Sequence, residues 1–484
     1  MPARTQLLLG GLLAAGANFG APTADSPRFS ETVRVVQKTE AAVAAVFSQA
    51  EGSLSMGSGS VVHPGGYVLT NEHVIANRPG VVLLKGHKPL KYRIVGSLPE
   101  KDLCLLKVST KEPLPHYIRL GRSHDLMTGE PILCAGNPGG RGIVYSSGIV
   151  SSPRFIVNAP NALTMYYFNT DVRDRFIQFD AASNGGNSGG PLINVLGEQV
   201  GVVASKNLKE ENINFAIPID RVRQNLPELF SPEVRKGFTT GFMIDPLAQK
   251  VIVAQVEKGS PAAKVGIRPG DHLQTLGGRP LQEPVDWMVQ LLRHGPGDTL
   301  QLEILAGSKK RKVRLKLAPY ATPRTVKLNH PKPGLKFKVC FGEFIRTPDF
   351  SEQKTVKAGV AWKLDVPAMG KPRKDHFAIQ LEGFLKIPSD GIYRLVLNSD
   401  DGSRLLLDGK ILIDNDGPHP AQDAGRLVRL AKGYLPIRID YFESTGDASL
   451  GLFIEDSPGK RESAEKLFYH EGERTAKPRT EEQQ

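Results

Sequence analysis

The sequence predicts a mainly β chain made of several domains, and three observations carry this prediction. The chain has 484 residues, which is more than one domain with a single hydrophobic core usually contains, since a domain takes roughly 150 residues. The 50 Gly and 36 Pro residues divide the chain by turns. Many short apolar segments lie between these turns, where a helical protein would have longer amphipathic stretches. Composition is that of a soluble protein, with 40% hydrophobic and 23% charged residues.

Residues 1–24 are interpreted as a secretory signal peptide. One arginine precedes an apolar stretch from Leu7 to Ala17, and small residues follow it. This stretch is too short to span a membrane. We therefore expect cleavage after Ala21 or Ala24 and a protein located in the periplasm or secreted. A mitochondrial-type leader is the alternative interpretation.

Residues 25–235 are predicted to form the first folded domain. Short apolar segments such as "GSGSVV", "GYVLTN", "DLCLLKV" and "PILCAG" are separated by Gly, Pro and Asn. Many short strands at this spacing predict an all-β barrel or sandwich. The segment "RVRQNLPELF", residues 221–230, is predicted to be a short helix that closes the domain.

A second domain is predicted over residues 236–319. It contains four strand-like segments and a helix, "PVDWMVQLLRHG", that ends at Gly295. Residues 320–334, "YATPRTVKLNHPKPG", are Pro-rich and poor in strand signals, so we expect an extended, semi-rigid linker.

The third predicted domain covers residues 335–470 and is again β-rich. Asp-Gly turns at Asp401-Gly402 and Asp408-Gly409 separate runs of alternating apolar residues, a pattern typical of a meander. Residues 471–484 are polar throughout, and we expect them to be a disordered tail.

Three residues form a candidate catalytic set: His73, Asp102 and Ser188. His73 follows the apolar segment "GYVLTN", Asp102 precedes "LCLLKV", and Ser188 lies in the Gly-rich stretch "SNGGNSGGPL". They occur in the order His, Asp, Ser, which is the order of the chymotrypsin class. His63, in the turn "HPGG", is a rival base that we interpret as a turn residue.

The chemistry of acyl transfer explains these residue types. A serine hydroxyl is a weak nucleophile at neutral pH, so Ser188 needs His73 to accept its proton. Asp102 would hold the imidazole in the right tautomer and stabilise the imidazolium. Gly186 allows the backbone to turn, so that its N–H and that of Ser188 form an oxyanion hole.

Charge bears on whether the protein binds an anionic partner, and cysteine content on whether it has disulfides or a metal site. The chain has 62 basic and 50 acidic residues, a net charge of +12, which raises the possibility of an anionic partner. Its densest basic run, "KKRKVRLKL", alternates charged and apolar residues as a strand with one solvated face does, so no nucleic acid is expected. Cys104, Cys134 and Cys340 do not form a disulfide framework, and no Cys/His cluster has metal-ligand spacing.

Six motifs along the first domain resemble, in order, those of the HtrA/Deg trypsin-like serine proteases. They are "LTNEHVI", "KDLCLLKV", "CAGNPGG", "SSGIVSS", "FIQFDAASNGGNSGGPLIN" and "FAIP", and the likeness covers about 200 residues. It implies a chymotrypsin-like double β-barrel with endopeptidase activity on unfolded or exposed polypeptides and no required cofactor. It also implies a homotrimer or higher homo-oligomer, assembled through the segment "PRFSETVRVV".

The resemblance also implies where specificity lies. Ala182 and Phe215 are expected in the specificity pocket. Ala182 stands six residues before Ser188, where tryptic enzymes carry an aspartate, so we expect small aliphatic side chains before the scissile bond. Asn187, next to Ser188, cannot form the ion pair that a newly cut N-terminus makes with an aspartate in zymogen-type relatives. Activation by cleavage is therefore not expected.

The segment "VEKGSPAAKVGIRPGDHLQTLGGRPL" in the second domain resembles a PDZ domain. Such domains bind a peptide as an added strand and hold its C-terminal carboxylate with backbone N–H groups. We expect the binding loop at Thr240, Gly241 and Phe242. The alternative is a PDZ domain that serves only as a spacer.

The third domain, with "SDDGSRLLLDGKILIDNDG", resembles the protective-antigen-type (PA-fourteen) β-sandwich. Some relatives bind calcium through adjacent aspartates, so Asp400 and Asp401 are a candidate calcium site, since hard oxygen ligands suit Ca²⁺. The same aspartates also suit a structural turn. Carbohydrate or a cell-surface ligand is a candidate partner, with adhesion or spacing as alternatives.

Two other functions are compatible with the sequence. In one, the chain is a catalytically silent scaffold whose PDZ and C-terminal domains bind peptides and carbohydrate. In the other, it also acts as a chaperone-like binder of unfolded polypeptide.

Overall fold

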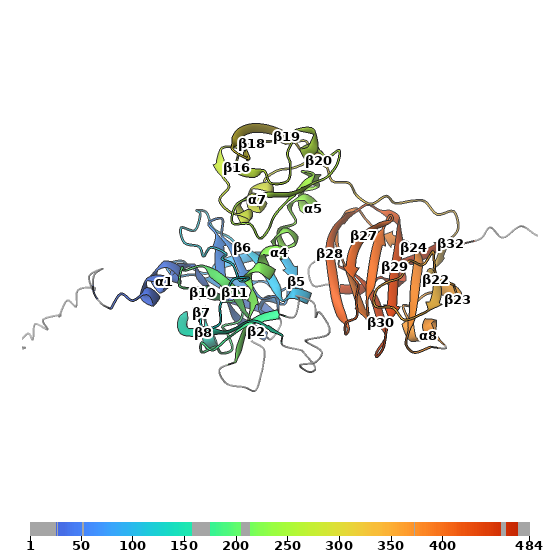
Figure 1. Ribbon diagram of the computed structural model, residues 1–484, viewed down its shortest axis with the longest axis horizontal. Helices are drawn as coiled ribbons and strands as arrows, with labels where there is room; N and C mark the ends of the chain where they lie inside the picture. The colour runs from blue at the N-terminus through green and yellow to red at the C-terminus, as the bar shows by residue number, and fades with distance from the viewer. Residues whose placement is uncertain are drawn as a thin grey trace, which may run out of the picture.

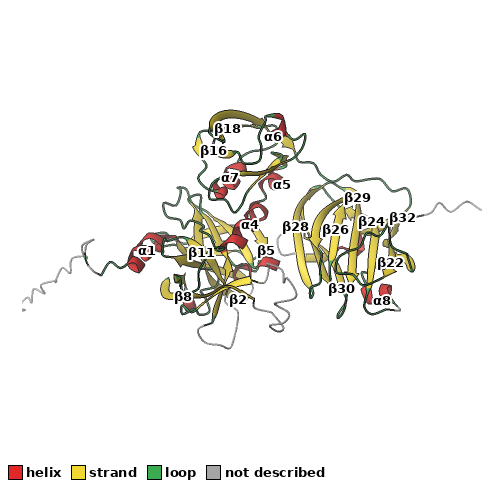
Figure 2. Cartoon of the chain, in the orientation of Figure 1, coloured by secondary structure: helices red, strands yellow, loops and turns green. Residues whose placement is uncertain are grey.

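The computed structural model describes residues 26, 28–50, 53–156, 175–204, 213–371, 373–455 and 461–472. The predicted signal peptide, residues 1–24, lies outside the described residues, and so does the predicted tail beyond Gly472. The described chain is mostly β, as predicted, with few helices (Figure 2). No described helix is both long enough and apolar enough to cross a membrane.

Two closed barrels of six antiparallel strands form the first part of the chain, called here the double-barrel domain (Figure 1). A helix, α1 (Glu31–Thr39), and a short turn, η1 (Glu40–Ala42), precede them. The first barrel has the order β1-β2-β3-β6-β5-β4. Its strands are β1 (Val43–Ala50), β2 (Ser53–His63), β3 (Tyr67–Thr70), β4 (Gly80–Leu83), β5 (Leu90–Leu98) and β6 (Leu103–Val108). A one-turn helix, α2 (Glu72–Ile75), follows β3, and η2 (Pro99–Lys101) joins β5 to β6.

The second barrel repeats the same architecture in the order β10-β11-β12-β9-β8-β7. Its strands are β7 (Pro131–Gly136), β8 (Val144–Ile156), β9 (Arg175–Phe179), β10 (Pro191–Asn194), β11 (Gln199–Ala204) and β12 (Asn214–Pro218), with η3 (Pro138–Gly140) after β7. Each barrel has its own core of buried aliphatic side chains, because inward-facing residues of closed barrels fill the interior. The expected double β-barrel is therefore confirmed.

The helix predicted at residues 221–230 is α4 (Ile219–Phe230), and it leaves the second barrel for the middle domain. Its buried face, which includes Val222, Leu226 and Phe230, belongs to a core that continues from the first barrel into the middle domain. A second short helix, α5 (Pro232–Lys236), completes this connection.

The middle domain packs a small β-structure around helix α7 (Pro284–Leu291). Its central sheet has the order β17-β16-β18-β19, and two smaller pairs are β13-β20 and β14-β15. The strands are β13 (Phe238–Thr239), β14 (Phe242–Ile244), β15 (Val253–Val256), β16 (His272–Leu276), β17 (Arg279–Pro280), β18 (Thr299–Ala306), β19 (Lys309–Lys316) and β20 (Ala318–Pro319), and α6 (Pro261–Lys264) follows β15. The basic run forms β19, where Val313 and Leu315 are buried and the lysines are exposed, as its alternation predicted.

The C-terminal domain consists of two sheets whose inner faces share one core, which is the arrangement of a β-sandwich. The larger sheet contains β21 (Pro331–Pro333), β22 (Leu335–Phe341), β23 (Lys357–Ala361), β24 (Phe377–Ile387), β26 (Ser403–Leu407), β27 (Lys410–Asn415), β29 (Gly433–Glu443) and β32 (Phe468–Glu471). The smaller sheet contains β25 (Gly391–Asp400), β28 (Gln422–Leu430), β30 (Ser449–Glu455) and β31 (Arg461–Ser463). Two short helices, α8 (Val366–Gly370) and η5 (Ala464–Leu467), complete the domain.

The segment predicted as a strand-poor linker, residues 320–334, takes part in this sheet. Its last residues form β21, which pairs with β32, and Val326 makes an isolated bridge to Tyr434. The prolines of this segment led us to expect no strand. Proline is, however, tolerated in an edge strand, so its presence does not exclude this pairing. In Figure 1 the middle domain lies above the double-barrel domain, and β28 of the C-terminal domain faces β5.

Candidate active site

His73 and Asp102 meet at the edge of the first barrel. His73 lies in α2, directly after β3, and Asp102 lies between η2 and β6. His73 Nδ1 is 2.9 Å from both carboxylate oxygens of Asp102, and the His73 N–H donates to Asp102 Oδ1 at 3.1 Å. A carboxylate only accepts hydrogen bonds, so Nδ1 carries the proton and Nε2 is left as the basic nitrogen.

The surroundings of His73 favour its protonated form. The hydrogen bond to Asp102 raises the pKa of the imidazole, burial partly opposes this, and the negative charges of Asp102 and Glu72 add to it. The pKa of Glu72 is raised by burial and then by the charge of Asp102. The His73 side chain is 47% exposed, so a substrate in solution can reach it.

Ser188 lies on the tight loop between β9 and β10, against the segment of the first barrel that leads into α2 and His73. Its carbonyl accepts a hydrogen bond from the Ser58 N–H of β2 at 2.8 Å. Gly189 has φ 83°, and a Cβ there would lie 2.3 Å from Ser58 O and 3.0 Å from Asn71 N. Only glycine fits this position. The structure therefore brings the Ser188 loop of the second barrel next to the Asn71–His73 segment of the first.

Gly186 and its neighbours fix the orientation of one peptide group in this loop. Gly186 has φ 103°, and a Cβ there would lie 2.5 Å from Asn137 O. The Gly139 N–H donates to Gly185 O at 3.1 Å. Because C=O and N–H of a trans peptide point in opposite directions, the Gly186 N–H faces away from Gly139. It makes no hydrogen bond within the described part of the chain.

Sequence reasoning missed Ser58, which holds the loop from the first barrel. Its Oγ donates to Gly186 O at 2.6 Å and accepts from the Asn137 N–H at 2.8 Å. Thr70 Oγ1 donates to Ser58 O at 2.7 Å. The alternation of Gly and Ser in "GSGSVV" was the available signal, since small residues in a buried strand mark close approach of another backbone.

Asn71 is a second residue that the sequence did not single out. Its Nδ2 donates to the backbone carbonyl of Asp102 at 2.9 Å, and Asp102 itself has a left-handed backbone with φ 52°. Such a backbone is uncommon outside glycine. The side chain of Asn71 therefore ties the turn that carries Asp102 to the residue just before α2.

The residues expected in the specificity pocket lie near the same loop. Ala182 is exposed, and its carbonyl accepts from Ser146 Oγ at 2.6 Å. Phe215 is buried, with its ring centroid 5.3 Å from that of Phe155 and 6.3 Å from that of Phe176. Their role in specificity stays a prediction.

His63 and Asn187 have structural surroundings. His63 Nε2 lies 3.2 Å from Asp286 Oδ1 of α7, and its Nδ1 accepts from the Gly65 N–H at 2.8 Å. Nδ1 is thus engaged within the turn and Nε2 at the contact with the middle domain, which supports the interpretation as a turn residue. Asn187 is 4% exposed, and its N–H donates to Asn184 O at 3.0 Å.

Comparison with known families assigns the three domains. The trypsin-like peptidase domain model matches residues 57–202, the PDZ domain model residues 230–317, and the PA14 domain model residues 332–463. The chain is a trypsin-like peptidase domain followed by a PDZ domain and a PA14 domain. The double-barrel domain is thus the peptidase domain, the middle domain is the PDZ domain, and the C-terminal domain is the PA14 domain.

Similar proteins carry names that agree with this assignment. A "probable periplasmic serine endoprotease DegP-like" of Brucella suis biovar 1 is 30% identical over 285 residues, which is 55% of this chain and 53% of that protein. A protein of the same name from Pseudomonas putida strain GB-1 is 34% identical over 274 residues, covering 53% and 54%. The chain thus spans about half the length of the curated relatives it matches.

Two solved structures are also similar. The serine endoprotease from Yersinia pestis is 26% identical, with a TM-score of 0.35, and the match covers 62% of this chain and 100% of that one. The HtrA-type protease AlgW with decapeptide is 25% identical, with a TM-score of 0.36, and the match covers 61% and 100%.

In the PDZ domain, the predicted carboxylate loop already contacts a carboxylate of this chain. Glu233 Oε1, on α5, accepts from the Thr240 N–H at 2.8 Å and from Thr240 Oγ1 at 2.5 Å. Gly241 has φ 76° and donates its N–H to Thr239 Oγ1 at 3.1 Å. Phe242 is buried against Trp287 of α7, with ring centroids 5.3 Å apart. Sequence reasoning missed Glu233, because nothing local links α5 to this loop.

In the PA14 domain, Asp400 and Asp401 hold backbone amides of neighbouring turns. Asp400 Oδ2 accepts from the Ala421 N–H at 3.0 Å. Asp401 Oδ1 accepts from the His419 N–H at 3.0 Å, and its Oδ2 from the Ser444 N–H at 2.9 Å. These contacts support the alternative interpretation of both side chains as turn residues. Among the described residues, no group of three or more His, Cys, Asp or Glu side chains could hold a metal ion.

The three cysteines are free thiols in buried positions. Burial raises the pKa of each of them, so they are held as neutral thiols. Buried, protonated thiols of this kind are unreactive.

Proposed function

We propose that this protein is a serine endopeptidase that uses Ser188 as nucleophile, His73 as general base and acid, and Asp102 as the orienting carboxylate. The single observation that carries the proposal is the pair formed by His73 Nδ1 and Asp102, 2.9 Å apart, next to the loop of Ser188. The trypsin-like peptidase domain supports the same reaction class.

The reaction proceeds through an acyl-enzyme. Ser188 Oγ attacks the carbonyl carbon of the scissile bond, and its proton passes to His73 Nε2. When the tetrahedral intermediate collapses, the C–N bond breaks and His73 returns the proton to the leaving amine. Water then attacks the acyl ester while His73 accepts a proton from the water. His73 returns this proton to Ser188 Oγ as the ester bond breaks.

The Gly186 and Ser188 N–H groups serve as the oxyanion hole in this proposal. The orientation of the Gly185–Gly186 peptide, fixed by the hydrogen bond from Gly139, supports the assignment for Gly186. Donors placed in advance at a developing negative charge are worth about 10²–10³ in rate each. We further propose that small aliphatic side chains fill a pocket lined by Ala182 and Phe215.

The substrates, partners and location are proposed as follows. Unfolded or exposed polypeptides are the substrates. The periplasm or the exterior is the location, and the name of the two relatives calls them periplasmic. The open edge of β14 next to α7 supports binding of a C-terminal peptide by the PDZ domain. We also propose that the protein forms a homotrimer or higher homo-oligomer. The PA14 domain is proposed to bind a carbohydrate or surface ligand, and Asp400 and Asp401 are proposed to bind calcium.

Cleavage of unfolded casein tests the activity. We expect the wild-type protein to cleave casein and the Ser188→Ala variant to lose at least 10³-fold in rate, because the oxyanion hole and binding alone give only residual catalysis. Ser183→Ala, in the same loop, is the matched serine control and should keep the wild-type rate. Equal cleavage by wild type and Ser188→Ala would contradict the proposal.

A further inference from the structure

A cationic cavity lies where the three domains meet. It has a volume of about 670 Å³, and its lining comes from the first barrel, the α5 connection, the PDZ domain and the PA14 domain. Six of the lining side chains are cations and one is an acid, Glu112. The cations are Arg93, Lys107, Lys111, Arg235, Lys236 and Arg293.

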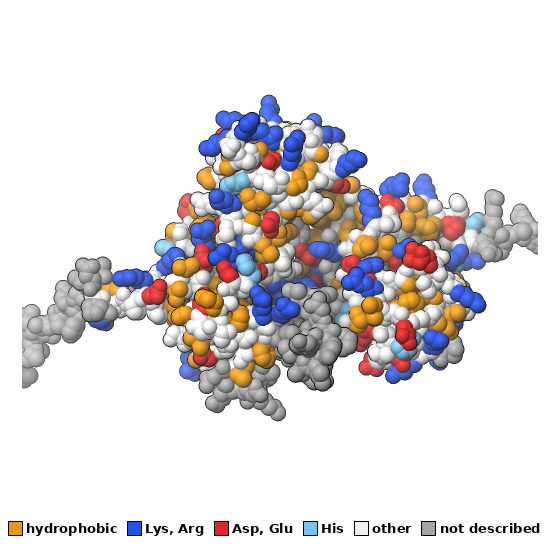
Figure 3. Space-filling view, viewed as in Figure 1, with side chains coloured by type: hydrophobic (Ala, Val, Ile, Leu, Met, Phe, Trp, Pro, Cys, Tyr) orange, Lys and Arg blue, Asp and Glu red, His pale blue; other side chains and the backbone are white. Residues whose placement is uncertain are grey.

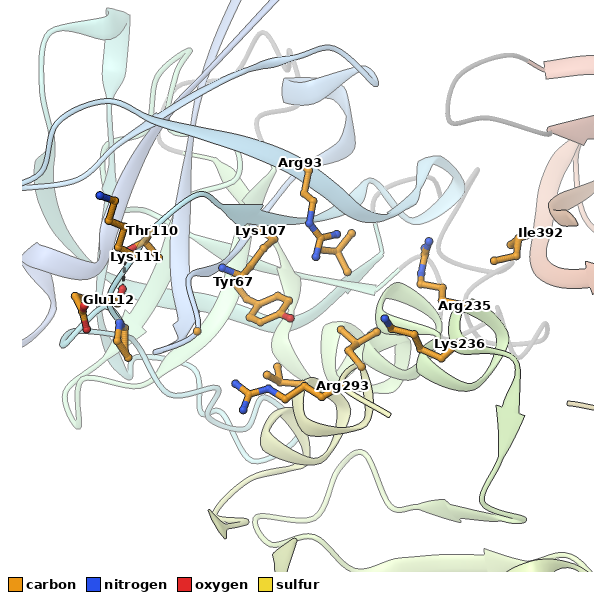
Figure 4. Close-up of a pocket in the computed structure, with 15 residues that line it drawn as sticks. Tyr67, Arg93, Lys107, Thr110, Lys111, Glu112, Arg235, Lys236, Arg293 and Ile392 are labelled. Carbon is orange, nitrogen blue, oxygen red and sulfur yellow. Dashed lines mark hydrogen bonds between the residues drawn. The ribbon is translucent and has the colours of Figure 1, made fainter. Parts of the chain in front are cut away.

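These side chains surround one space. Figure 4 shows Arg93 and Lys107 of the first barrel on one side of it, and Lys236 of α5 and Arg293 of the PDZ domain on the other. The ring of Tyr67 lies between them, and Lys107 Nζ is 5.8 Å from its centroid. The cavity therefore has an aromatic floor and charged walls.

The described residues provide no acidic partner for these cations. Within the described part of the chain, none of the six forms an ion pair with an Asp or Glu side chain. Lys107 Nζ instead donates to the carbonyl of Val108 at 3.0 Å, and Arg235 Nε to that of Phe230 at 3.2 Å. Other cations of this protein do have acidic partners, as in the pairs Arg119–Glu283 and Arg426–Glu228.

The cations also repel one another. Burial lowers the pKa of Lys107, and the charge of Arg93 lowers it further. The same two causes lower the pKa of Arg235. Like charges held together without a counter-charge destabilise the arrangement, so an anion in the cavity would relieve this repulsion.

We propose that this cavity binds a free, multiply charged phosphate anion such as a short polyphosphate. Guanidinium groups bind phosphate oxygens in a bidentate manner, and lysines add point charges. The cavity is large enough for several phosphate groups. Its position between domains favours a small anion in solution over the head group of a lipid in a membrane.

Binding would also join the domains, because the cations come from separate parts of the chain. Arg93 belongs to β5 of the peptidase domain, Lys236 to the end of α5, and Arg293 to the PDZ domain after α7. An anion that contacts all three would stabilise the PDZ domain against the first barrel. This inference concerns binding alone and does not depend on the proposed peptidase activity.

Titration calorimetry of the full chain with tripolyphosphate at low ionic strength tests the inference. We expect saturable binding of one anion per chain, which weakens as salt is added, and a rise in melting temperature of about 2 to 4 °C at saturation. The double variant Lys236→Ala/Arg293→Ala should bind at least tenfold more weakly. Both side chains are exposed, so their removal leaves the core intact.

A matched control removes two charges elsewhere in the PDZ domain. Lys309 and Lys310 are exposed at the start of β19. Figure 3 shows many Lys and Arg side chains over the domain at the top of the view, which is the PDZ domain in Figure 1. The variant Lys309→Ala/Lys310→Ala should bind tripolyphosphate like wild type. Absence of saturable binding, an equal loss in both variants, or binding only to phosphatidylglycerol vesicles would overturn the inference.

Discussion

At the scale of residues, the pair His73–Asp102 predicts the pH dependence of the activity. In the proposed mechanism the base form of His73 accepts the proton of Ser188, and Asp102 raises the pKa of His73 above its ordinary value of 6.5. Activity should therefore fall as pH decreases through a value above 6.5. The measurement is the pH profile of kcat/KM for a peptide substrate.

The Asp102→Asn variant is the corresponding test. We expect its kcat to fall by about 10³- to 10⁴-fold, because the amide favours the wrong tautomer of the imidazole. Its residual activity should show the acidic limb at lower pH, since the hydrogen bond that raises the pKa of His73 is gone. An unchanged limb would show that Asp102 is not the partner that sets the pKa of the base.

Glu443 gives a second pH prediction, for the stability of the PA14 domain. The side chain is buried and shares a hydrogen bond of 2.6 Å with Tyr441, and burial raises its pKa to about 7. The folded state therefore binds a proton that the unfolded state releases near pH 4.5. The stabilisation is complete below pH 4.5 and is lost as pH rises to about 7.

We expect wild type to lose about 2 to 3 kcal/mol of unfolding free energy over this interval. Glu443→Gln, which stays neutral, should lose less and be the more stable protein at pH 8. Urea unfolding at pH 5 and pH 8, followed in both proteins, measures this difference. An equal loss in both would contradict the prediction.

The candidate catalytic residues could be predicted from local signals. His73 and Asp102 stand beside apolar segments, Ser188 stands among glycines, and the three follow the order of the chymotrypsin class. Ser58 and Asn71 could not be predicted with the same ease. Their roles depend on which strands become neighbours in space, since Ser58 contacts Gly186 across 128 residues of chain. A single hydroxyl that bridges two barrels leaves only a weak local signal.

At the scale of elements, the contact between α5 and the loop before β14 predicts that Glu233 competes with the carboxylate of a peptide for the PDZ domain. Glu233 of α5 holds the Thr240 N–H, one of the groups expected to hold a peptide carboxylate. Two carboxylates at one set of donors repel each other. Glu233→Gln should therefore bind a C-terminal peptide about 5- to 10-fold more tightly than wild type.

Fluorescence anisotropy with a labelled peptide measures this change. The gain should appear with a free C-terminus and not with an amidated one, because only the free carboxylate meets Glu233. Glu303→Gln on β18 is a control that removes the same charge from an exposed position. Equal gains in both variants would point to the overall charge of the domain instead.

Strand and helix positions were largely predictable, and the exceptions have physical causes. The predicted helices appear as α4 and α7, because their apolar residues recur at helical spacing. The pairing of β21 with β32 joins two segments far apart in sequence. Neither segment alternates strongly enough to indicate a strand by itself.

At the scale of the whole molecule, a buried ion pair joins the PA14 and peptidase domains. Arg394 of β25 lies 2.5 Å from Glu100 of η2, with side-chain exposures of 10% and 6%. Glu100 stands two residues before Asp102. A residue 294 positions away in the chain thus contacts the turn that carries Asp102, which no local pattern could indicate.

We expect Arg394→Met to lower kcat with little change in KM, because the turn of Asp102 loses its anchor. It should also destabilise the interface by roughly 3 to 5 kcal/mol, since Glu100 stays buried without a partner. Adding Glu100→Gln should restore part of the stability. Kinetics and thermal unfolding of the single and double variants measure both effects.

The control for this prediction is a second ion pair between the same two domains, which involves helix α4 and not the turn that carries Asp102. Arg426 pairs with Glu228 at 2.8 Å, and its side chain is 54% exposed. The Glu228 side chain is 16% exposed, so this pair is only partly exposed and its loss should also lower stability. Because the pair does not contact the turn of Asp102, Arg426→Met should leave kcat unchanged. An equal loss of kcat in Arg426→Met and Arg394→Met would contradict a specific role for the Glu100 contact.

The central claim is that Ser188 is a nucleophile activated by His73 and Asp102. Labelling of the full chain with a fluorophosphonate, followed by mass spectrometry of the modified peptide, tests it most directly, because only an activated serine reacts. We predict one adduct, at Ser188, that is lost in His73→Ala and retained in Ser183→Ala. Absence of an adduct in wild type, or an adduct that persists in His73→Ala, would contradict the account and favour a catalytically silent scaffold.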